Sequence, residues 1–562
     1  MDISQNVRKL ARLFVLLFLA LTVGFVYWQV GVAQAVTSNI HNGRVCMKGN
    51  EPVRGRIFDR NGVLLAYATP AKCGVVMHYT DPSLGGLIGY YVNAAESSGI
   101  EKQFDPYLSG QMGSTMLGNT VNGLLHRPPV GDDIYLTIDD RIQKIANAHF
   151  DDPTLIDGMV SFGSNRGSMI VSDPKTGEIL AMVSRPSFDP NMLAQQLSQG
   201  DFTYFNSIST GVDQPLLERP LQGLYAPGSI FKTPTLLGAL DSGATTLTQQ
   251  FDGQHAFGPV TLGGVVTGAN QVGSNLANYT IHVPVDTQYG FTHSDNVIFA
   301  QIGVKMGTQS WQDYMNRFYI GQTIPFDLPV AKSSVVPAGQ TLDTGLLSND
   351  AFGQGDDFVT PLQMSLIDNV AANGGQLMKP SIVQKIVDPT SKAAVYQDPD
   401  QMLGQPVLAN AANAVLQSMY SVVNCGSGLV PGAQVSTSPW GIVGKTGTAQ
   451  VGAFNGNTHA HGWMITAAPY SAQNPGQLPA LTIVAMKENS GDGAPSVGPM
   501  ITNTYNDIFN QGLVKVTQPP AVPNVYCCQS GMLQTGPGCV GVTRNVTYDA
   551  NDIATFPQQQ QQ

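Results

Sequence analysis

The stretch Ala226-Pro227-Gly228-Ser229-Ile230-Phe231-Lys232 is the point from which the other motifs of the sequence can be interpreted. A Pro-Gly pair breaks the chain here, and apolar residues at helical spacing then continue as far as Ser242-Gly243. In a helix, Ser229 and Lys232 would share one face, with the serine at the N-terminus. Because a serine hydroxyl needs a nearby base to act as a nucleophile, the stretch predicts a catalytic serine–lysine pair. An N-cap serine followed by a surface lysine would explain the same residues.

The same spacing occurs a second time, in Ser172-Asp173-Pro174-Lys175, which runs into Lys175-Thr176-Gly177. Residues 168–172 and 178–184 have the pattern of two strands, and the Asp-Pro and Gly between them predict a tight turn. No helix can align Ser172 with Lys175 at the tip of a hairpin. We therefore exclude this second pair as a catalytic one.

Two more motifs follow Ser229 in a fixed order. Ser294-Asp295-Asn296 runs directly into an apolar helical segment, and Gly444-Lys445-Thr446-Gly447-Thr448 lies further along the chain. Each motif alone has an ordinary explanation, the first as a helix N-cap and the second as the end of a strand. Ser-x-x-Lys, Ser-Asp-Asn and Lys-Thr-Gly together form the signature of penicillin-binding proteins and class A β-lactamases.

On these motifs the sequence resembles the class B penicillin-binding proteins, which are membrane-anchored peptidoglycan D,D-transpeptidases. Other stretches carry the same resemblance: residues 54–62, 173–184, 225–232, 353–380 and 461–463. The resemblance covers most of the chain after residue 30. It implies an α+β, penicillin-binding transpeptidase fold, in which helices flank an antiparallel sheet. This fold would stand on a small mixed pedestal domain behind one N-terminal transmembrane helix.

The predicted catalytic residues are Ser229, Lys232, Ser294 and Lys445. Ser229 is the nucleophile, and burial near a second cation would lower the pKa of Lys232 so that its amine acts as the base. Ser294 would relay the proton toward the leaving amine. Lys445 would keep the local field positive, and Asp295 is expected to have a structural role.

The predicted substrate-binding residues are Asn296, Thr446, Gly447 and Thr448. Asn296 would hold a substrate amide, and the hydroxyls of Thr446 and Thr448 would bind a terminal carboxylate beside Lys445. The resemblance also implies an oxyanion pocket made by the backbone N–H groups of Ser229 and Thr448, with each donor worth about 3 kcal/mol.

The N-terminus has the pattern of a membrane anchor. Arg8, Lys9 and Arg12 precede an apolar run over residues 13–30, which is long enough to span a bilayer. The positive flank predicts that residues 1–9 are cytoplasmic, that residues 10–30 cross the membrane and that the catalytic part is extracytoplasmic. A cleaved signal peptide is the alternative, because Ala33-Gln34-Ala35 has the small-x-small form, but the apolar run is longer than a usual signal.

The rest of the chain divides by composition. Residues 31–166 mix Gly-rich loops with a few regular elements and are the predicted pedestal. We expect a hairpin over residues 54–66 around Asn61-Gly62, a strand over 133–138 and a helix near 139–150. Residues 167–517 form the predicted transpeptidase domain. Residues 518–562 are rich in Pro, Gly, Cys and Gln and are the predicted tail.

The charge balance and the cysteines narrow the classes of partner and cofactor. The net charge of −11 argues against a nucleic-acid partner, because no basic stripe is present to replace counterions. Six cysteines fit an oxidising compartment, although their pairing does not follow from the sequence. None has Cys-x-x-Cys spacing, and His459 and His461 lack a third ligand nearby. We therefore expect no metal and no cofactor.

Two enzymatic functions remain open on these residues. A transpeptidase would pass the acyl group from Ser229 to an amine, whereas a serine β-lactamase or D,D-carboxypeptidase would pass it to water. No glutamate lies between Glu218 and Glu488, which argues against the class A β-lactamase mechanism. The resemblance implies peptidoglycan stem peptides and β-lactams as ligands. It also implies a polytopic SEDS-family glycosyltransferase that contacts the membrane span and the pedestal.

Overall fold

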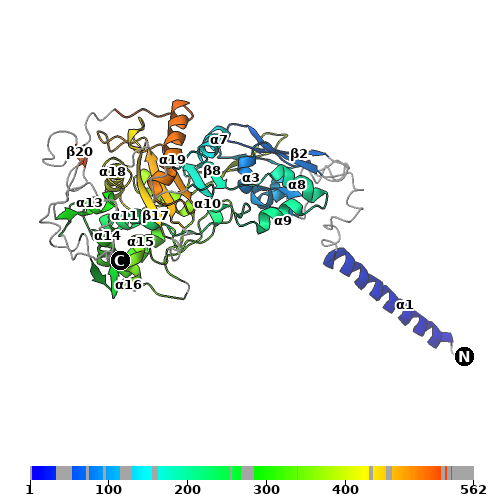
Figure 1. Ribbon diagram of the computed structural model, residues 1–562. Coiled ribbons are helices and arrows are strands. Elements are labelled where there is room, and N and C mark those ends of the chain that lie inside the picture. Colours follow the sequence, from blue (N-terminus) through cyan, green and yellow to red (C-terminus); the bar gives the residue numbers. More distant parts are fainter. Residues whose placement is uncertain are drawn as a thin grey trace.

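The computed structural model has two folded units and a separate N-terminal helix (Figure 1). It describes residues 3–32, 53–70, 75–92, 96–113, 130–154, 163–252, 256, 259–267, 284–337, 339–429, 435–450, 459–520, 526–527 and 533–534. One unit contains the predicted pedestal and the other contains the three catalytic motifs.

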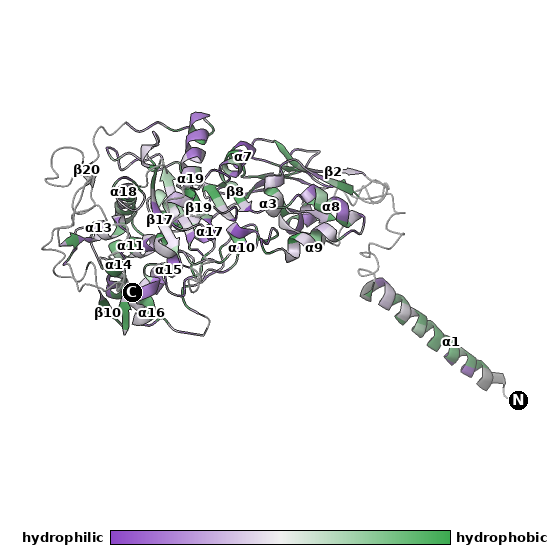
Figure 2. Ribbon diagram, in the orientation of Figure 1, coloured by the Kyte–Doolittle hydropathy of each residue, from purple (hydrophilic) through white to green (hydrophobic). Residues whose placement is uncertain are grey.

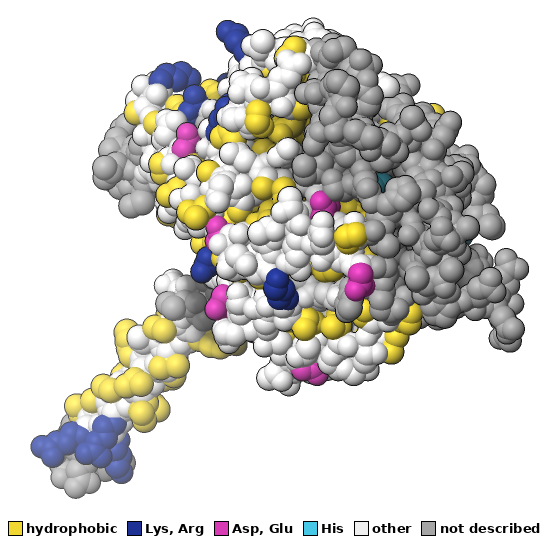
Figure 3. Space-filling view, turned by 90° about the vertical axis from the view of Figure 1, so that its left-hand side faces the viewer, with side chains coloured by type: hydrophobic (Ala, Val, Ile, Leu, Met, Phe, Trp, Pro, Cys, Tyr) yellow, Lys and Arg dark blue, Asp and Glu magenta, His cyan; other side chains and the backbone are white. Residues whose placement is uncertain are grey.

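The N-terminal helix α1 (Ile3–Val26) continues into a short π-helical segment, Tyr27–Gly31. The 23 residues Val7–Gln29 are long and apolar enough to cross a membrane, and none of the window is buried against the rest of the chain. Figure 2 shows hydrophobic residues along this helix, and Figure 3 shows basic side chains gathered at its N-terminal end. Its length and polarity therefore fit the predicted anchor, while Ala33-Gln34-Ala35 lies outside the described residues.

The pedestal is built on a six-stranded sheet in the order β15-β14-β6-β1-β2-β3. The bounds in that order are Ala394–Gln397, Val383–Val387, Asp133–Leu136, Ile57–Phe58, Leu64–Pro70 and Val75–Tyr79. Strands β1 and β2 are antiparallel neighbours, which confirms the predicted hairpin. Strand β6 pairs in parallel with β1 and antiparallel with β14.

Strands β14 and β15 come from residues assigned by composition to the transpeptidase domain. The predicted boundary at residue 166 therefore does not separate the two sheets, because the pedestal sheet includes two strands from beyond it. The physical reason is that β6 would otherwise present an unpaired edge, which β14 covers by pairing over Val383–Val387. Helix α8 (Pro190–Ser198) also packs on β3, so the chain returns to the pedestal before it reaches Ser229.

The second unit is organised around a five-stranded antiparallel sheet in the order β17-β18-β19-β7-β8. The bounds in that order are Val443–Ala449, His461–Ala468, Leu481–Lys487, Gly167–Ser172 and Ile179–Arg185. Alternate residues of β7 face different cores, because Met169 packs with α7 (Asp140–His149) and α19 (Gly493–Asn510) while Ile170 packs on the opposite face. Helices therefore cover both faces of the sheet, as the predicted fold requires.

On the opposite face, α17 (Pro361–Ala372) and α18 (Ala409–Cys425) pack directly on the sheet. The helices that begin at motif residues lie beyond them, because α11 (Lys232–Asp241) packs on α17 and α18, and α14 (Asn296–Met306) packs on α11. The remaining helices are η2 (Pro82–Leu84), α3 (Gly85–Ile88), α4 (Gly99–Gln103), α5 (Asp105–Leu108), α9 (Thr203–Thr210), α10 (Arg219–Gln222), η4 (Gly228–Phe231), α13 (Thr287–Thr292), α15 (Thr308–Arg317), α16 (Thr344–Asp350) and η5 (Val435–Thr437). Short strands complete the described structure: β4 (Tyr91–Val92), β5 (Glu96–Ser97), β9 (Gln250–Phe251), β10 (Val260–Leu262), β11 (Val265–Thr267), β12 (Val285–Asp286), β13 (Leu377–Met378), β16 (Met402–Gly404), β20 (Tyr526–Cys527) and β21 (Leu533–Gln534).

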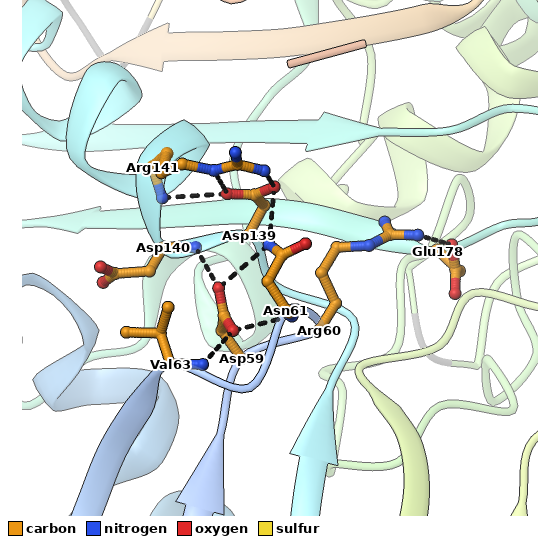
Figure 4. Close-up of polar contacts among 8 residues, drawn as sticks. All are labelled: Asp59, Arg60, Asn61, Val63, Asp139, Asp140, Arg141 and Glu178. Atoms are coloured by element: carbon orange, nitrogen blue, oxygen red, sulfur yellow. Dashed lines mark hydrogen bonds and ion pairs between the residues drawn. The ribbon is translucent and has the colours of Figure 1, made fainter.

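A polar cluster after β1 joins the two units (Figure 4). The Asp59 carboxylate accepts hydrogen bonds from the backbone N–H of Asn61, at 2.8 Å, and from that of Asp140 at the start of α7, at 3.2 Å. Arg60 reaches Glu178, at the start of β8, with a nitrogen–oxygen distance of 3.0 Å. The motif at residues 54–62 therefore does more than form a hairpin, because it fixes the pedestal against the catalytic unit.

The structure shows the bonding state of one of the six cysteines, which were predicted to lie in an oxidising compartment. Cys425, at the end of α18, is disulfide-bonded. Cys46, Cys73, Cys528 and Cys539 lie outside the described residues, as do residues 268–283 of the Gly-rich insertion and most of the predicted tail. The disulfide at Cys425 agrees with an oxidising compartment.

The pedestal contains a buried ion pair whose loss should destabilise it. Arg54 donates to Glu101 and to Asp105, at 2.6 Å for the second, and the side chains of Arg54 and Glu101 are 2% and 1% exposed. Because Glu101→Ala leaves a buried guanidinium with one partner, we expect it to lower the free energy of unfolding by about 3 kcal/mol. Thermal unfolding should show this as a lower midpoint for the pedestal transition.

The matched control is Asp151→Ala, which removes an ion pair with Arg185 in which the Asp151 side chain is 63% exposed. Surface pairs of this kind contribute about 1 kcal/mol or less, so the midpoint should hardly move. Equal midpoints for the two variants would contradict a stabilising role for the Arg54–Glu101 pair.

Candidate active site

Ser229 lies in a 3-10 turn, η4, and not in the first turn of an α-helix as predicted. Helix α11 begins only at Lys232. The turn is possible because Gly228 has φ +57° and lies so close to β17 that a Cβ there would be 2.5 Å from the Thr448 carbonyl oxygen. Side chains three residues apart eclipse each other in a 3-10 helix, so the tighter turn brings Ser229 directly beside Lys232.

The amine of Lys232 lies at the centre of the site. Its Nζ atom is 2.7 Å from Ser229 Oγ, 2.5 Å from Asn296 Oδ1 and 3.4 Å from Ser294 Oγ. The side chain is fully buried, and the ring of Phe352 lies 5.6 Å from the amine. The structure therefore brings the Ser-x-x-Lys and Ser-Asp-Asn motifs together around one nitrogen.

Burial changes the proton affinity of both lysines in the site. It lowers the pKa of Lys232 to about 7, against a smaller opposing effect from the Asp295 carboxylate. Burial also lowers the pKa of Lys445 far below its ordinary value, and the charge of Lys232 lowers it further. Near neutral pH, a substantial fraction of Lys232 is therefore an uncharged amine that can accept a proton.

Ser294 lies between the two lysines. Its backbone has φ +62°, which is uncommon for a residue with a side chain, and the Asp295 carboxylate caps α14 by accepting from the Ile298 N–H at 3.0 Å. Lys445 Nζ lies 2.8 Å from Ser294 Oγ. The cap therefore holds a strained turn that places the Ser294 hydroxyl within reach of both amines, and the predicted structural role of Asp295 is confirmed.

Strand β17 supplies the third motif. Gly447 packs directly against the nucleophile turn, because a Cβ there would lie 2.9 Å from the Ile230 side chain. The hydroxyl of Thr446 lies 2.7 Å from Ser427 Oγ, and the hydroxyl of Thr448 donates to Asp492 Oδ1 at 2.9 Å. Each of the two threonine hydroxyls is thus held by a side chain from outside the strand.

Three residues that contact β17 are not among the predicted site residues: Ser427, Asp492 and Gln354. Ser427 and Asp492 are single residues outside any motif, and their approach to β17 depends on how α18 and α19 pack. Gln354 donates from Nε2 to the Thr448 carbonyl oxygen at 3.4 Å, and its Gly-Gln-Gly stretch belongs to residues 353–380, which carry the family resemblance. Only Gln354 therefore carried a usable sequence signal.

A second network supports the segment before Ser229. Tyr225 donates from its hydroxyl to Glu488 Oε1 at 2.8 Å, and Arg219 donates to the same oxygen at 2.7 Å. The Trp463 ring is fully buried beside Tyr225 and belongs to the core. This network ties the strand pair β18–β19 to the nucleophile turn.

The remaining sequence candidates do not enter the site. Ser172 is buried and hydrogen-bonded to Thr482, whereas Lys175 is exposed on the β7–β8 turn, so these two do not form a pair. His461 accepts a hydrogen bond from the Asn489 N–H at 3.0 Å. Within the part of the chain that the structure describes, no three His, Cys, Asp or Glu side chains are grouped so that they could hold a metal ion.

Comparison with known proteins agrees with this geometry. Residues 167–504 match the family model described as the penicillin binding protein transpeptidase domain. The chain is 28% identical over 509 residues to peptidoglycan D,D-transpeptidase PbpA of Mycolicibacterium smegmatis, covering 88% of this chain and 96% of the relative. It is 26% identical over 448 residues to peptidoglycan D,D-transpeptidase MrdA of Escherichia coli, covering 73% and 64% of the two chains.

The fold has close counterparts among solved structures. The imipenem acyl-enzyme complex of penicillin-binding protein A from M. tuberculosis superimposes with a TM-score of 0.68 at 27% identity, over 82% of this chain and 99% of that one. Its penicillin G acyl-enzyme complex gives a TM-score of 0.67. The matched family model covers more than half of the chain and includes all three motifs around Lys232. The chain therefore belongs to the penicillin-binding protein transpeptidase family.

Proposed function

We propose that this chain is a class B penicillin-binding protein, a peptidoglycan D,D-transpeptidase that cross-links stem peptides through an acyl-Ser229 intermediate. The observation that carries the proposal is the 2.7 Å contact between Ser229 Oγ and the buried amine of Lys232. The names of its relatives in M. smegmatis and E. coli give the same reaction. The acyl donor would be a peptide ending in D-Ala-D-Ala.

Acylation begins with uncharged Lys232. Its amine takes the Ser229 proton while Oγ attacks the carbonyl carbon of the penultimate residue. The backbone N–H groups of Ser229 and Thr448 would bind the oxyanion, each contributing about 3 kcal/mol. When the C–N bond breaks, Ser294 gives its proton to the leaving amine and regains one from Lys232, 3.4 Å away.

The substrate would lie along β17. The terminal carboxylate would bind the hydroxyls of Thr446 and Thr448 beside the amine of Lys445, with Gly447 keeping the strand close to the nucleophile. Asn296 would hold a backbone amide of the donor. Asn296 contacts the amine of Lys232, and Lys445 contacts Ser294 beside it, which favours one shared site for peptides and β-lactams.

The acyl group would then pass to an amine of a neighbouring strand. The class A route to water requires a glutamate that positions the water molecule. The nearest glutamates in sequence are Glu218 and Glu488, and the Glu488 carboxylate is bound by Arg219 and Tyr225. Transfer to an amine is therefore the better supported fate.

The same proposal gives the protein its place in the cell. Residues 1–9 would be cytoplasmic, α1 would anchor the chain in the cell membrane, and both folded units would be extracytoplasmic. A polytopic SEDS-family glycosyltransferase would polymerise the strands that this enzyme cross-links, in contact with α1 and the pedestal. The apolar surface of α1 and the fixed pedestal joint at Asp59 support such an arrangement.

The nucleophile can be tested with a fluorescent penicillin. We expect wild-type protein to be labelled covalently and Ser229→Ala to lose all labelling, because Ser229 Oγ is the hydroxyl in closest contact with the Lys232 amine, at 2.7 Å. The control is Ser172→Ala, which alters the serine of the other Ser-x-x-Lys sequence and should retain labelling. Labelling of Ser229→Ala would contradict the assignment.

The fate of the acyl-enzyme separates the two reactions. With a D-amino acid as acceptor, we expect the release of product carrying the acceptor, and slow conversion of penicillin to its hydrolysed form. Mass spectrometry of the products measures both. Rapid penicillin hydrolysis that the acceptor does not slow would favour a β-lactamase or carboxypeptidase instead.

The pKa of Lys232 predicts how the acylation rate depends on pH. Since the lowered pKa of Lys232 is about 7, the uncharged fraction rises with pH through that value. Acylation at pH 6 should be about tenfold slower than on the plateau above pH 8. Lys232→Arg should be slower by about a thousandfold, because a guanidinium stays protonated. Stopped-flow acylation measures both effects.

Lys175→Arg is the matched control, since Lys175 is exposed on the β7–β8 turn and should leave the profile unchanged. A rate that does not change between pH 6 and pH 8 would rule out Lys232 as the base.

A further inference from the structure

Asp492 contacts Thr448 and does not cap the helix that follows it. Asp492 is the residue before α19, where a carboxylate usually accepts from the first N–H groups of the helix. Here its side chain makes no such cap and instead accepts from Thr448 Oγ1 at 2.9 Å. The carboxylate is therefore turned toward the strand that forms the active site.

An ionised carboxylate can only accept hydrogen bonds, and a threonine hydroxyl has a single proton to donate. While Asp492 holds that proton, the oxygen of Thr448 offers only lone pairs to the site. Thr446 differs, because its partner Ser427 is a hydroxyl that can donate to it and leave its own proton free. The two threonines therefore present different hydrogen-bonding groups to a ligand.

We infer that Asp492 is a specificity-determining residue that withholds the Thr448 proton and so lowers the affinity of the site for the terminal carboxylate of the acyl donor. This inference rests on the proposed function, in which Thr448 binds that carboxylate. The substrate must compete with Asp492 for one proton and also meets a second negative charge. Neutral or proton-donating terminal groups, such as a carboxamide, do not meet this competition.

The charged and titratable groups on the neighbouring elements have other partners. Asp492 is therefore the group that competes with a ligand for the Thr448 proton. Lys445 on β17 donates to Ser294, and Glu488 after β19 is bound by Arg219. His461 begins β18 and accepts from Asn489, and Lys487 at the end of β19 lies beside Thr154. Burial raises the pKa of Asp492, and the bond from Thr448 lowers it less. The competition therefore strengthens as pH rises and Asp492 loses its proton.

The test measures acylation of the full-length protein in detergent by benzylpenicillin, whose carboxylate stands for that of the donor. The binding constant and the acylation rate constant are resolved separately. Asp492→Asn removes the charge and can donate to Thr448, and Asp492→Ala removes the acceptor. Both should tighten binding about fivefold, the factor for one hydrogen bond, with little change in the acylation step. The ratio of wild type to variant should grow with pH, while the titration of Lys232 cancels in it.

Thr448→Val provides the coupling test, because Asp492→Asn should have no effect on binding in that background. Asp507→Asn, on the same helix but bound to His149, is the matched control and should match wild type. The inference is overturned if both Asp492 variants bind penicillin as wild type does, or if the gain persists without the Thr448 hydroxyl. Labelling of Ser229 in the same samples keeps the proposed function separate, since its loss in wild type would refute that function instead.

Discussion

The buried amine of Lys232 is the constraint on which the rest of the catalytic unit depends. An ammonium group removed from water is costly unless it is neutralised or fully hydrogen-bonded. Here Ser229, Ser294 and Asn296 surround the nitrogen, and they come from two separate segments of the chain. Both segments must keep hydrogen-bonding distance to this nitrogen, so one atom constrains the placement of η4 and of the start of α14.

The way in which those segments are held follows from small residues and caps. Gly228 and Gly447 let the nucleophile turn approach β17 without a side chain between them. Asp295 caps α14 and so fixes the strained turn that carries Ser294. On the far side of the sheet, α7 and α19 supply a hydrophobic core without polar groups of the site. The reactive groups are therefore prepared before a substrate arrives, which is the condition for effective electrostatic catalysis.

Local pattern predicted the strands β7 and β8, helix α7 and the hairpin of β1 and β2, because each shows its own periodicity and turn chemistry. The order of the three motifs was enough to identify the residues around Lys232. The 3-10 geometry at Ser229 was missed, because it is set by the contact of Gly228 with Thr448 and not by the helix that follows. Ser427 and Asp492 could not be found, since a single polar residue carries no pattern and its place depends on helix packing.

The pairing of β14 with β6 has a consequence for the way the protein is made. The pedestal begins near the N-terminus, yet its sheet is complete only after β14 (Val383–Val387) and β15 have been synthesised. Until then the edge of β6 is an open template for another strand, during the time in which most of the catalytic unit is still emerging. The two units are thus linked in their order of assembly, because the pedestal sheet closes only after the chain has passed through much of the catalytic unit. The sheet of the catalytic unit is completed later still, by β17, β18 and β19.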